Sequence, residues 1–377
     1  MEVAVNRREF SVLLGGAAAP LVQRAYAQQN AQQKNAAPAN PVPRLDWVAR
    51  RKEPILEPEL KIIDPHHHLW LRPGWRYLLD DLLADTGSGH NIVATVYMEA
   101  NSMYRDRGQE EMRPVGEVEF ANGVAAMCSS GVFGKTRVAA GIVGHADMML
   151  GSRVEPVLNA LMRAGGDRFR GIRHGVSWEA EAATIRPNPS TRAGMLADKK
   201  FREGVAVLGR LGLSYDVSLY HTQIPEVADL AGALPKTRML LNHVGGVLGL
   251  GSYRGKQEEV FSRWASSIKA LAARPNVYVK LGGLGQSYTA MRFDGDAEPP
   301  SSEQVAARFR PYVETCITAF GGSRCMFESN FPVDKISYSY HVFWNACKRL
   351  AKGASVVEKA DLFAGTAARC YRLDGIV

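Results

Sequence analysis

Short runs of apolar and β-branched residues recur from residue 61 onward and alternate with segments of helical periodicity bounded by Gly or Pro. This alternation is typical of a parallel α/β fold, in which a helix connects each strand to the next. Eight runs have strand character: residues 61–70, 92–100, 137–145, 168–174, 213–221, 238–246, 277–285 and 324–333. They predict an α/β fold of the (β/α)8 type, a TIM barrel. A doubly wound open sheet is the alternative, but no GxGxxG segment follows a strand.

Polar residues gather at the carboxyl ends of these runs, where a barrel carries its chemistry. The connections after the second, fourth and seventh runs, about residues 101–136, 175–200 and 286–304, are long. We expect them to shape a cavity at that end of the barrel. Trp178 lies in one of these connections and is a candidate for contact with a substrate.

Two histidines at the end of the first strand are the strongest candidates for chemistry. Side chains two residues apart on a strand share a face, so His66 and His68 should project together into the barrel mouth, and His67 should point away. Two convergent imidazoles suit a divalent metal such as Zn, which takes nitrogen and carboxylate ligands. The sequence therefore predicts a site at His66 and His68.

Other charged residues end later strands. Arg173 and His174 close the fourth run, where a guanidinium could hold a substrate carboxylate or stabilise a developing oxyanion. Lys280 in the seventh run could form a Schiff base, although a structural ion pair is the simpler expectation. Asp334 follows the eighth run and is expected to cap the next helix, with support of the site as the alternative.

The segment IIDPHHHLW resembles the D-x-H-x-H signature of the amidohydrolase superfamily, in its amidohydrolase-related (amidohydrolase 2) branch. The resemblance covers about residues 61–373. Further segments support it in family order: GIRH (171–174), LNHVGG (241–246), KLGGLG (280–285), ESNFPVD (328–334) and LFAGTAARCYRL (362–373). It implies a TIM-barrel hydrolase, because relatives in this branch include sugar lactonases and other lactone hydrolases. Decarboxylases use the same barrel, so the substrate does not follow from the fold.

The resemblance also assigns roles to single residues. It implies that His66 and His68 are metal ligands and that His243 binds the metal or contacts the substrate. On the fifth strand, where many relatives place a histidine ligand, this chain offers either Asp216 or His221 as a catalytic or substrate-binding group.

The eighth strand departs from the family pattern. Relatives have an Asp that binds the metal and takes a proton from water, whereas this chain has Asn330, whose amide has no basic site. Glu328 or Glu99 could supply the missing carboxylate. Whether a divalent metal is required stays open, because metal-independent lactonases occur in the branch. Restoring the charge with Asn330→Asp is expected to preserve packing and tighten metal binding.

Together with these residues, the resemblance implies a hydrolase that opens a lactone or related cyclic ester of a small carboxylated or sugar-derived molecule. A metal-dependent decarboxylase on the same barrel is one alternative, and release of carbon dioxide would distinguish it. A catalytically weakened binding protein, suggested by Asn330, is the other.

Residues 1–27 have the composition of a signal peptide. Arg7 and Arg8 precede an apolar stretch at 12–22 and an Ala-Tyr-Ala cleavage site at 25–27. The paired arginines resemble a twin-arginine signal, so we expect recognition by the twin-arginine export machinery and a periplasmic location. An uncleaved membrane anchor is the alternative.

The remaining chain divides into a flexible linker, expected at 28–44 from its Gln, Asn, Ala and Pro content, and a barrel domain at 45–377. A chain of 377 residues, 46% hydrophobic, exceeds the roughly 250 residues that one barrel needs. The net charge of +8 comes without basic runs interleaved with aromatics, so no nucleic-acid partner is expected. The five cysteines form no CxxC pair. No stable membrane insertion is expected after cleavage.

Overall fold

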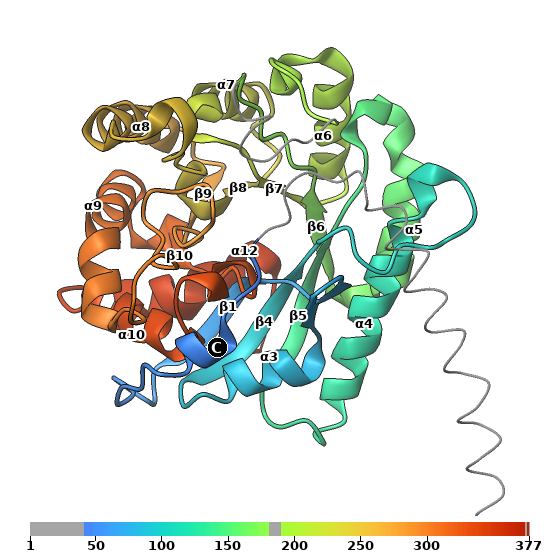
Figure 1. Cartoon of the computed structure of the whole chain (residues 1–377). Helices are drawn as coiled ribbons and strands as arrows, with labels where there is room; N and C mark the ends of the chain where they lie inside the picture. The colour runs from blue at the N-terminus through green and yellow to red at the C-terminus, as the bar shows by residue number, and fades with distance from the viewer. Residues whose placement is uncertain (1–40, 181–189, 374, 377) are drawn as a thin grey trace, which may run out of the picture. The chain divides into compact units, whose positions relative to one another are not determined.

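The computed structural model describes residues 41–180, 190–373, 375 and 376. Within them, eight parallel strands form one sheet in the order β1-β4-β5-β6-β7-β8-β9-β10, and helices surround these strands (Figure 1). The strands of this sheet are β1 (Lys61–His67), β4 (Asn91–Met98), β5 (Arg137–Gly144), β6 (Phe169–Arg173), β7 (Ser214–Val217), β8 (Met239–Leu241), β9 (Val277–Leu281) and β10 (Cys325–Phe327). The helices are α2 (Leu45–Val48), α3 (Leu79–Thr86), α4 (Val115–Ser129), α5 (Glu155–Gly165), α6 (Lys199–Arg210), α7 (Ile224–Ala233), α8 (Gln257–Ala272), α9 (Ser302–Phe320), α10 (Tyr340–Leu350), α11 (Val356–Ala360) and α12 (Thr366–Tyr371).

All eight predicted strands are present and parallel, so the TIM barrel is confirmed and the open sheet is excluded. The last strands end earlier than predicted. The runs at 213–221, 238–246 and 324–333 stop pairing at residues 217, 241 and 327. Their polar ends leave the sheet because the backbone there turns over the barrel mouth, and it reaches positive φ at His243 and Asn330.

The seam between β1 and β10 closes the barrel. His67 pairs with Phe331 in a parallel bridge, and the backbone N–H of Asn330 donates to the carbonyl of His66 at 2.9 Å. Asp64 fastens the same seam with its side chain. It accepts bonds from the backbone N–H of Ser329 at 3.0 Å and from the Ser329 hydroxyl at 2.5 Å. The Asp of the D-x-H-x-H segment therefore holds the first strand to the last.

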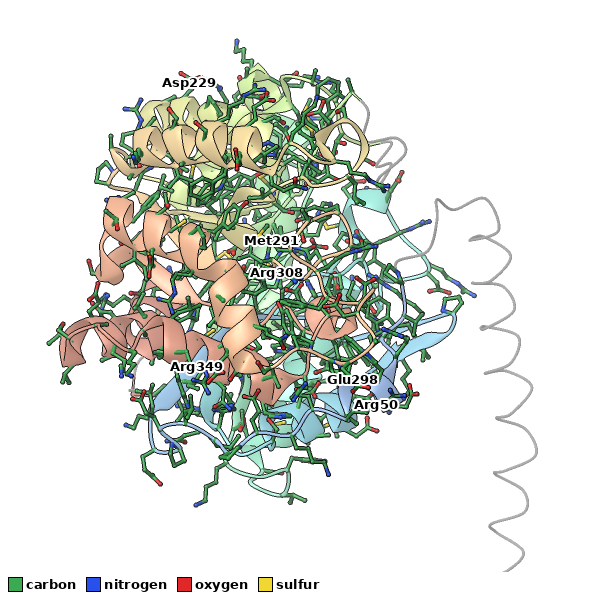
Figure 2. All side chains as sticks on the ribbon, turned by 60° about the vertical axis from the view of Figure 1, so that its left-hand side comes forward. Arg50, Asp229, Met291, Glu298, Arg308 and Arg349 are labelled. Atoms are coloured by element: carbon green, nitrogen blue, oxygen red, sulfur yellow. The ribbon has the colours of Figure 1, made fainter. Side chains whose placement is uncertain are left out.

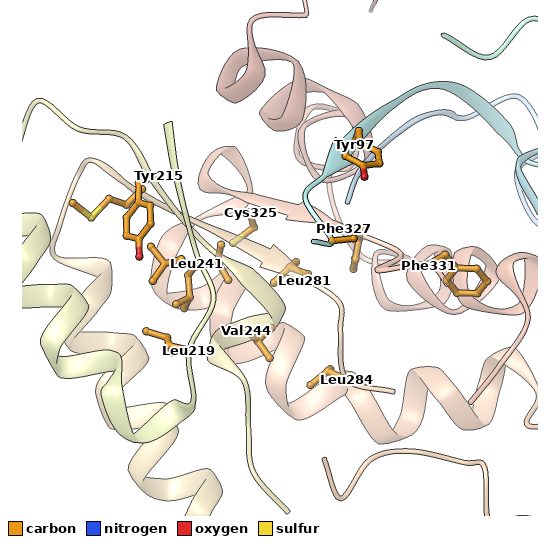
Figure 3. Packing of buried hydrophobic residues seen from close by; sticks show 14 of the residues in the cluster. Tyr97, Tyr215, Leu219, Leu241, Val244, Leu281, Leu284, Cys325, Phe327 and Phe331 are labelled. Atoms are coloured by element: carbon orange, nitrogen blue, oxygen red, sulfur yellow. The ribbon is translucent and has the colours of Figure 1, made fainter. Parts of the chain in front are cut away.

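Two apolar layers position the strands. The outer layer packs between strands and helices, and Leu241, Leu281 and Phe327 from β8, β9 and β10 belong to it (Figure 3). The inner layer fills the barrel and includes residues of α12. This helix lies at the amino ends of the strands, where Arg238 just before β8 donates to the carbonyl of Cys370 at 2.8 Å. The amino end is therefore plugged, which leaves the carboxyl end for chemistry.

The segment before β1 contacts the long connection that precedes α9. Trp47 donates from Nε1 to the carbonyl of Ala297 at 3.1 Å, and Arg50 lies 3.6 Å from Glu298 (Figure 2). Arg44, in the predicted linker, donates to the carbonyl of Asp294 at 2.8 Å. The predicted signal peptide and linker residues 28–40 lie outside the described residues.

A small hairpin follows β1 and was not predicted, because the first run was extended through Trp70. Its strands are β2 (Trp70–Arg72) and β3 (Trp75–Tyr77), paired antiparallel. The turn contains Gly74 at φ +70°, a conformation that favours glycine. Among the described residues, no helix is both long and apolar enough to cross a membrane.

We expect Ser329→Ala to lower the free energy of unfolding by about 1–3 kcal/mol, because it removes the buried hydrogen bond that the Ser329 hydroxyl donates to Asp64. Urea denaturation measures the change. Ser267→Ala is the matched control, since its exposed hydroxyl bonds only within α8, and it should stay within about 0.5 kcal/mol. Equal stability of the two variants would show that the hydrogen bond from the Ser329 hydroxyl to Asp64 does not stabilise the seam.

Candidate active site

The carboxyl ends of the strands surround a cavity of about 750 Å³. The three long connections all contribute to its wall, for example through Tyr104, Met195 and Tyr288, although residues 181–189 of the second lie outside the described residues. The connection after β5 and the β2–β3 hairpin line the cavity as well. Six predicted site residues border it: His68, Glu99, Arg173, His174, His243 and Asn330.

Beneath this cavity, Glu328 joins His66 and His243 in a buried cluster. Glu328 Oε1 lies 2.8 Å from His243 Nδ1 and also accepts the backbone N–H of His243 at 2.9 Å. Glu328 Oε2 lies 2.7 Å from His66 Nδ1. Glu328 and His66 are fully buried, and His243 is 6% exposed. Of the two carboxylates that the sequence offered, Glu328 is therefore the one that contacts the histidines.

Hydrogen-bond chemistry assigns the proton of His243 in this cluster. An ionised carboxylate only accepts, so His243 donates from Nδ1 to Glu328. His66 faces a donor-only side chain at each nitrogen, because Arg173 Nη1 lies 3.2 Å from its Nε2 and Lys280 Nζ lies 3.4 Å from its Nδ1. Burial lowers the pKa of both histidines, which keeps both rings neutral at pH 7. Nε2 of His243 has no hydrogen-bond partner among the described residues and is the nitrogen left for the cavity.

The charges around Glu328 favour its ionised form. Burial acts to raise the pKa of Glu328, but His243 and Lys280 together outweigh it, and the pKa lies below its usual value. Lys280 Nζ lies 3.9 Å from Glu328 and forms an ion pair with Asp216 at 2.8 Å. Two carboxylates facing one ammonium leave one negative charge uncompensated. A proton taken up by His243 would neutralise it.

Local backbone geometry brings His243 to this position. His243 and Val244 have φ of 56° and 47°, in the left-handed region that costs a non-glycine residue about 1 kcal/mol or more. The ring also needs empty space, because a Cβ on Gly283 would lie 2.3 Å from His243 Nδ1. A Cβ on Gly282 would lie 2.0 Å from the carbonyl oxygen of Glu328. The two glycines of KLGGLG thus leave room for the histidine and the carboxylate.

Arg173 and Glu99 form a second, charge-paired element at the cavity. Arg173 Nε donates to Glu99 Oε1 at 2.7 Å, and Nη2 donates to the carbonyl of Glu99. Burial acts to raise the pKa of Glu99, but Arg173 and then His145 hold it below its usual value. Glu99 is therefore committed to Arg173. The bonds to Glu99 and His66 use three of the five guanidinium N–H groups, which leaves two for a ligand.

His67 and His68 point in opposite directions, as predicted. His67 Nε2 contacts Thr95 Oγ1 at 2.9 Å, and His68 borders the cavity with its Nδ1 2.9 Å from the carbonyl of Met98. The rings of His66 and His68 lie 5.0 Å apart. His68 is nevertheless outside the group of donor atoms formed by His66 and Glu328. Its role as a metal ligand stays a prediction.

Besides His66 and Glu328, which lie beneath the cavity, three predicted residues do not reach it. Asp216 lies deeper in the barrel, where it accepts the hydroxyl of Tyr371 at 2.8 Å in addition to its ion pair. His221 accepts the backbone N–H of Leu248 at 3.3 Å through Nδ1, and so turns away after β7. Trp178 is outside the lining. Neither fifth-strand candidate is therefore placed as a cavity ligand, contrary to expectation.

Asn330 has a structural partner that the sequence did not reveal. Its Nδ2 donates to Asp334 Oδ1 at 2.8 Å, and Asp334 Oδ2 accepts the N–H of Gly285 and the hydroxyl of Tyr338. Burial raises the pKa of Asp334 to about 7. The sequence led us to expect that Asp334 caps a helix. It does not, and instead it orients Asn330, in line with the alternative that it supports the site.

The donor groups of a metal site are present, but their arrangement does not fit a divalent ion. His66, His243 and Glu328 offer three donor atoms within 4.8 Å of one another. Their N to O distances of 2.7 and 2.8 Å are hydrogen-bond distances, shorter than the roughly 3.0–3.4 Å between donors that share one zinc ion. In addition, Lys280 lies 3.4 Å from His66 Nδ1, and Arg173 occupies Nε2. An ion would have to displace one of these cations.

Sequence reasoning missed His145 as a site residue. It follows β5 directly, borders the cavity, and lies 5.2 Å ring to ring from His174. Its Nδ1 donates to the carbonyl of Arg173 at 3.1 Å, whereas His174 Nδ1 accepts the backbone N–H of Met148 at 3.0 Å. The signal was present, because His145 ends its predicted strand as His174 ends the next.

Comparisons with known proteins agree with this architecture. An amidohydrolase family model matches residues 63–373. Uncharacterized protein y4mH of Sinorhizobium fredii is 34% identical over 84% of this chain and 99% of its own. An L-fucono-1,5-lactonase of Burkholderia multivorans is 27% identical over 82% of this chain and 96% of its own. The crystal structure of a zinc-bound amidohydrolase from Burkholderia multivorans has a TM-score of 0.63 at 24% identity and covers 83% of this chain and 99% of that one.

The Asn330–Asp334 contact revises the expectation for Asn330→Asp. The variant replaces a donor to Asp334 with a second carboxylate, so the folded-state pKa of the pair rises further above its unfolded value. Stability is then lost as the pH rises, and we expect a deficit of at least about 1 kcal/mol at pH 8 that shrinks at pH 5. Urea denaturation at both pH values measures it. Asn159→Asp, at a partly exposed site on α5, is the control. A variant as stable as the native protein at pH 8 would contradict this account.

Proposed function

This chain belongs to the amidohydrolase family and is a hydrolase, and we propose that it opens the lactone ring of a small sugar-derived or carboxylated molecule. The observation that carries the proposal is the Glu328–His243 pair, with one imidazole nitrogen held by a buried carboxylate and the other left for the cavity. The relative that acts on a sugar lactone, at 27% identity over most of both chains, supports the substrate class.

His243 is the general base in this proposal. Glu328 accepts its Nδ1–H and so fixes the tautomer in which Nε2 holds a lone pair. Nε2 takes a proton from water as the oxygen attacks the lactone carbonyl carbon. The resulting imidazolium is stabilised by Glu328. Its positive charge balances the negative charge left over when the two carboxylates of Glu328 and Asp216 face the one ammonium of Lys280. The base that Asn330 cannot provide is thus supplied by His243, in the turn after β8.

Arg173 stabilises the oxyanion in the same proposal. Its guanidinium is held in place by Glu99 and His66, so the two remaining N–H groups are oriented before the substrate arrives. Preorganised donors of this kind contribute typically 3–4 kcal/mol to transition-state stabilisation. His68 keeps Nε2 on the cavity side and can accept a hydrogen bond from a substrate hydroxyl.

The cavity wall suits a polar, ring-shaped ligand. Tyr104, Tyr220 and Tyr288 contribute phenol groups, and Gln286 contributes an amide. Arg72 also borders the cavity, with its guanidinium 3.9 Å from the ring centre of Trp70. A stacked guanidinium can pair with a carboxylate, which is the support for carboxylated lactones as substrates.

We expect the native protein to open lactones in a panel that includes L-fucono-1,5-lactone and D-glucono-1,5-lactone, measured by proton release at constant pH. Gly283→Ala should lower kcat/KM at least about a hundredfold, or about 2.7 kcal/mol, because the added Cβ displaces His243. Gly74→Ala is the matched control: it has nearly the same positive φ but no atom within 4 Å of the new Cβ. Carbon dioxide release without acid formation would overturn lactone opening, and equal activity of the two variants would remove His243 from the mechanism.

We also expect hydrolysis to survive removal of metal. Lys280 and Arg173 already face both nitrogens of His66, so chelation followed by desalting should leave kcat/KM within about twofold. Metal content is measured on the same sample. Loss of turnover upon chelation and recovery with one equivalent of Zn would contradict this part of the proposal.

A further inference from the structure

His145 and the cluster of the Glu328–His243 pair contact different parts of Arg173. Nδ1 of His145 donates to the carbonyl of Arg173 at 3.1 Å, and the Arg173 guanidinium contacts His66, which contacts Glu328. In the sheet, β5 precedes β6, and two more strand positions lead to β8. His145 follows β5 and His243 follows β8, so their imidazoles reach the cavity from either side of β6, which carries Arg173.

The orientation of His145 suits a proton donor. The Arg173 carbonyl holds Nδ1, so Nε2 lies on the other edge of a partly exposed ring that borders the cavity. Nε2 has no hydrogen-bond partner among the described residues. Because a carbonyl accepts from either the neutral or the cationic ring, protonation of Nε2 breaks no bond. The carboxylate of Asp147 also borders this part of the cavity.

The neighbouring histidines cannot take this role. His174 accepts the N–H of Met148 through Nδ1, so protonation of that nitrogen would break the bond. Burial also lowers the pKa of His174 to about 3. His68 is placed to accept a hydrogen bond from a substrate hydroxyl through Nε2, and that contact leaves no proton on Nε2 to donate.

We propose that His145 is the general acid that protonates the leaving alkoxide when the ring opens. This inference rests on the proposed lactone hydrolysis. Water loses a proton to His243 Nε2 and bonds to the carbonyl carbon, which gives the oxyanion beside Arg173. As the carbonyl re-forms, the ring C–O bond breaks and its electron pair goes to the alkoxide oxygen, which takes the proton from His145 Nε2. The product is a hydroxy acid. The proton left on His243 passes to solvent, and His145 takes one from solvent.

The test compares two classes of lactone. An aliphatic alkoxide needs a proton on leaving, whereas a phenoxide is stable without one. His145→Asn keeps an amide N–H near the position of Nδ1 and removes Nε2. We expect it to lower kcat/KM at least about a hundredfold for D-glucono-1,5-lactone, but less than about fivefold for dihydrocoumarin. His341→Asn, at a histidine outside the cavity lining, should change neither value, and thermal denaturation checks that both variants fold.

Each outcome decides one question. An equal loss for both lactones would make His145 a positioning residue for Arg173, and no loss for the aliphatic lactone would remove it from the reaction. Either result overturns the inference while leaving the proposed function intact. A native protein that opens neither lactone class, while other chemistry is found, overturns the proposed function itself and the inference with it.

Discussion

A fully buried carboxylate must be compensated by its neighbours, and Glu328 imposes this constraint on the whole site. Oε1 is met by Nδ1–H and the backbone N–H of His243, whereas Oε2 has no hydrogen-bond partner among the described residues and lies near His66 Nδ1 and the more distant ammonium of Lys280. These groups come from β1, β9 and the turn after β8, so they meet only if the barrel closes. The glycines after β9 and the left-handed turn at His243 follow from the same requirement, because any side chain there would separate the pair.

Closure of the barrel and the chemistry at its mouth are linked through adjacent residues of two strands. Asp64 accepts two hydrogen bonds from Ser329. His66 lies two positions after Asp64, Glu328 directly precedes Ser329, and both belong to the buried cluster. Asn330 then bonds Asp334 instead of acting on water. Glu328, just after β10, provides a carboxylate, and in the proposed mechanism this carboxylate acts through His243. The proposed base therefore lies in the turn after β8, and it does not require a carboxylate at position 330.

Periodicity predicted the fold because each strand and helix buries one face, and that requirement is local in the sequence. Strand alternation also predicted that His66 and His68 would be near the mouth, and the family resemblance added His243. It could not choose between Glu328 and Glu99, since the choice depends on which cation each carboxylate meets across the barrel. Asp216 and His221 were misplaced for the same reason: the strand ends at Val217, and the chain then turns His221 away. The Asp334 contact depends on a turn after the strand, and no periodicity reports it.

The central claim is that Glu328 holds His243 in the neutral Nδ1–H form. Nitrogen-15 NMR of the histidine side chains at pH 7, without added metal and with His243 assigned by its Gln variant, measures this directly. The account predicts a protonated Nδ1 and an unprotonated Nε2 at His243, with loss of this tautomer in Glu328→Leu, which has no acceptor atom at this position. A native His243 protonated at Nε2 alone, or a tautomer unchanged in Glu328→Leu, would contradict it.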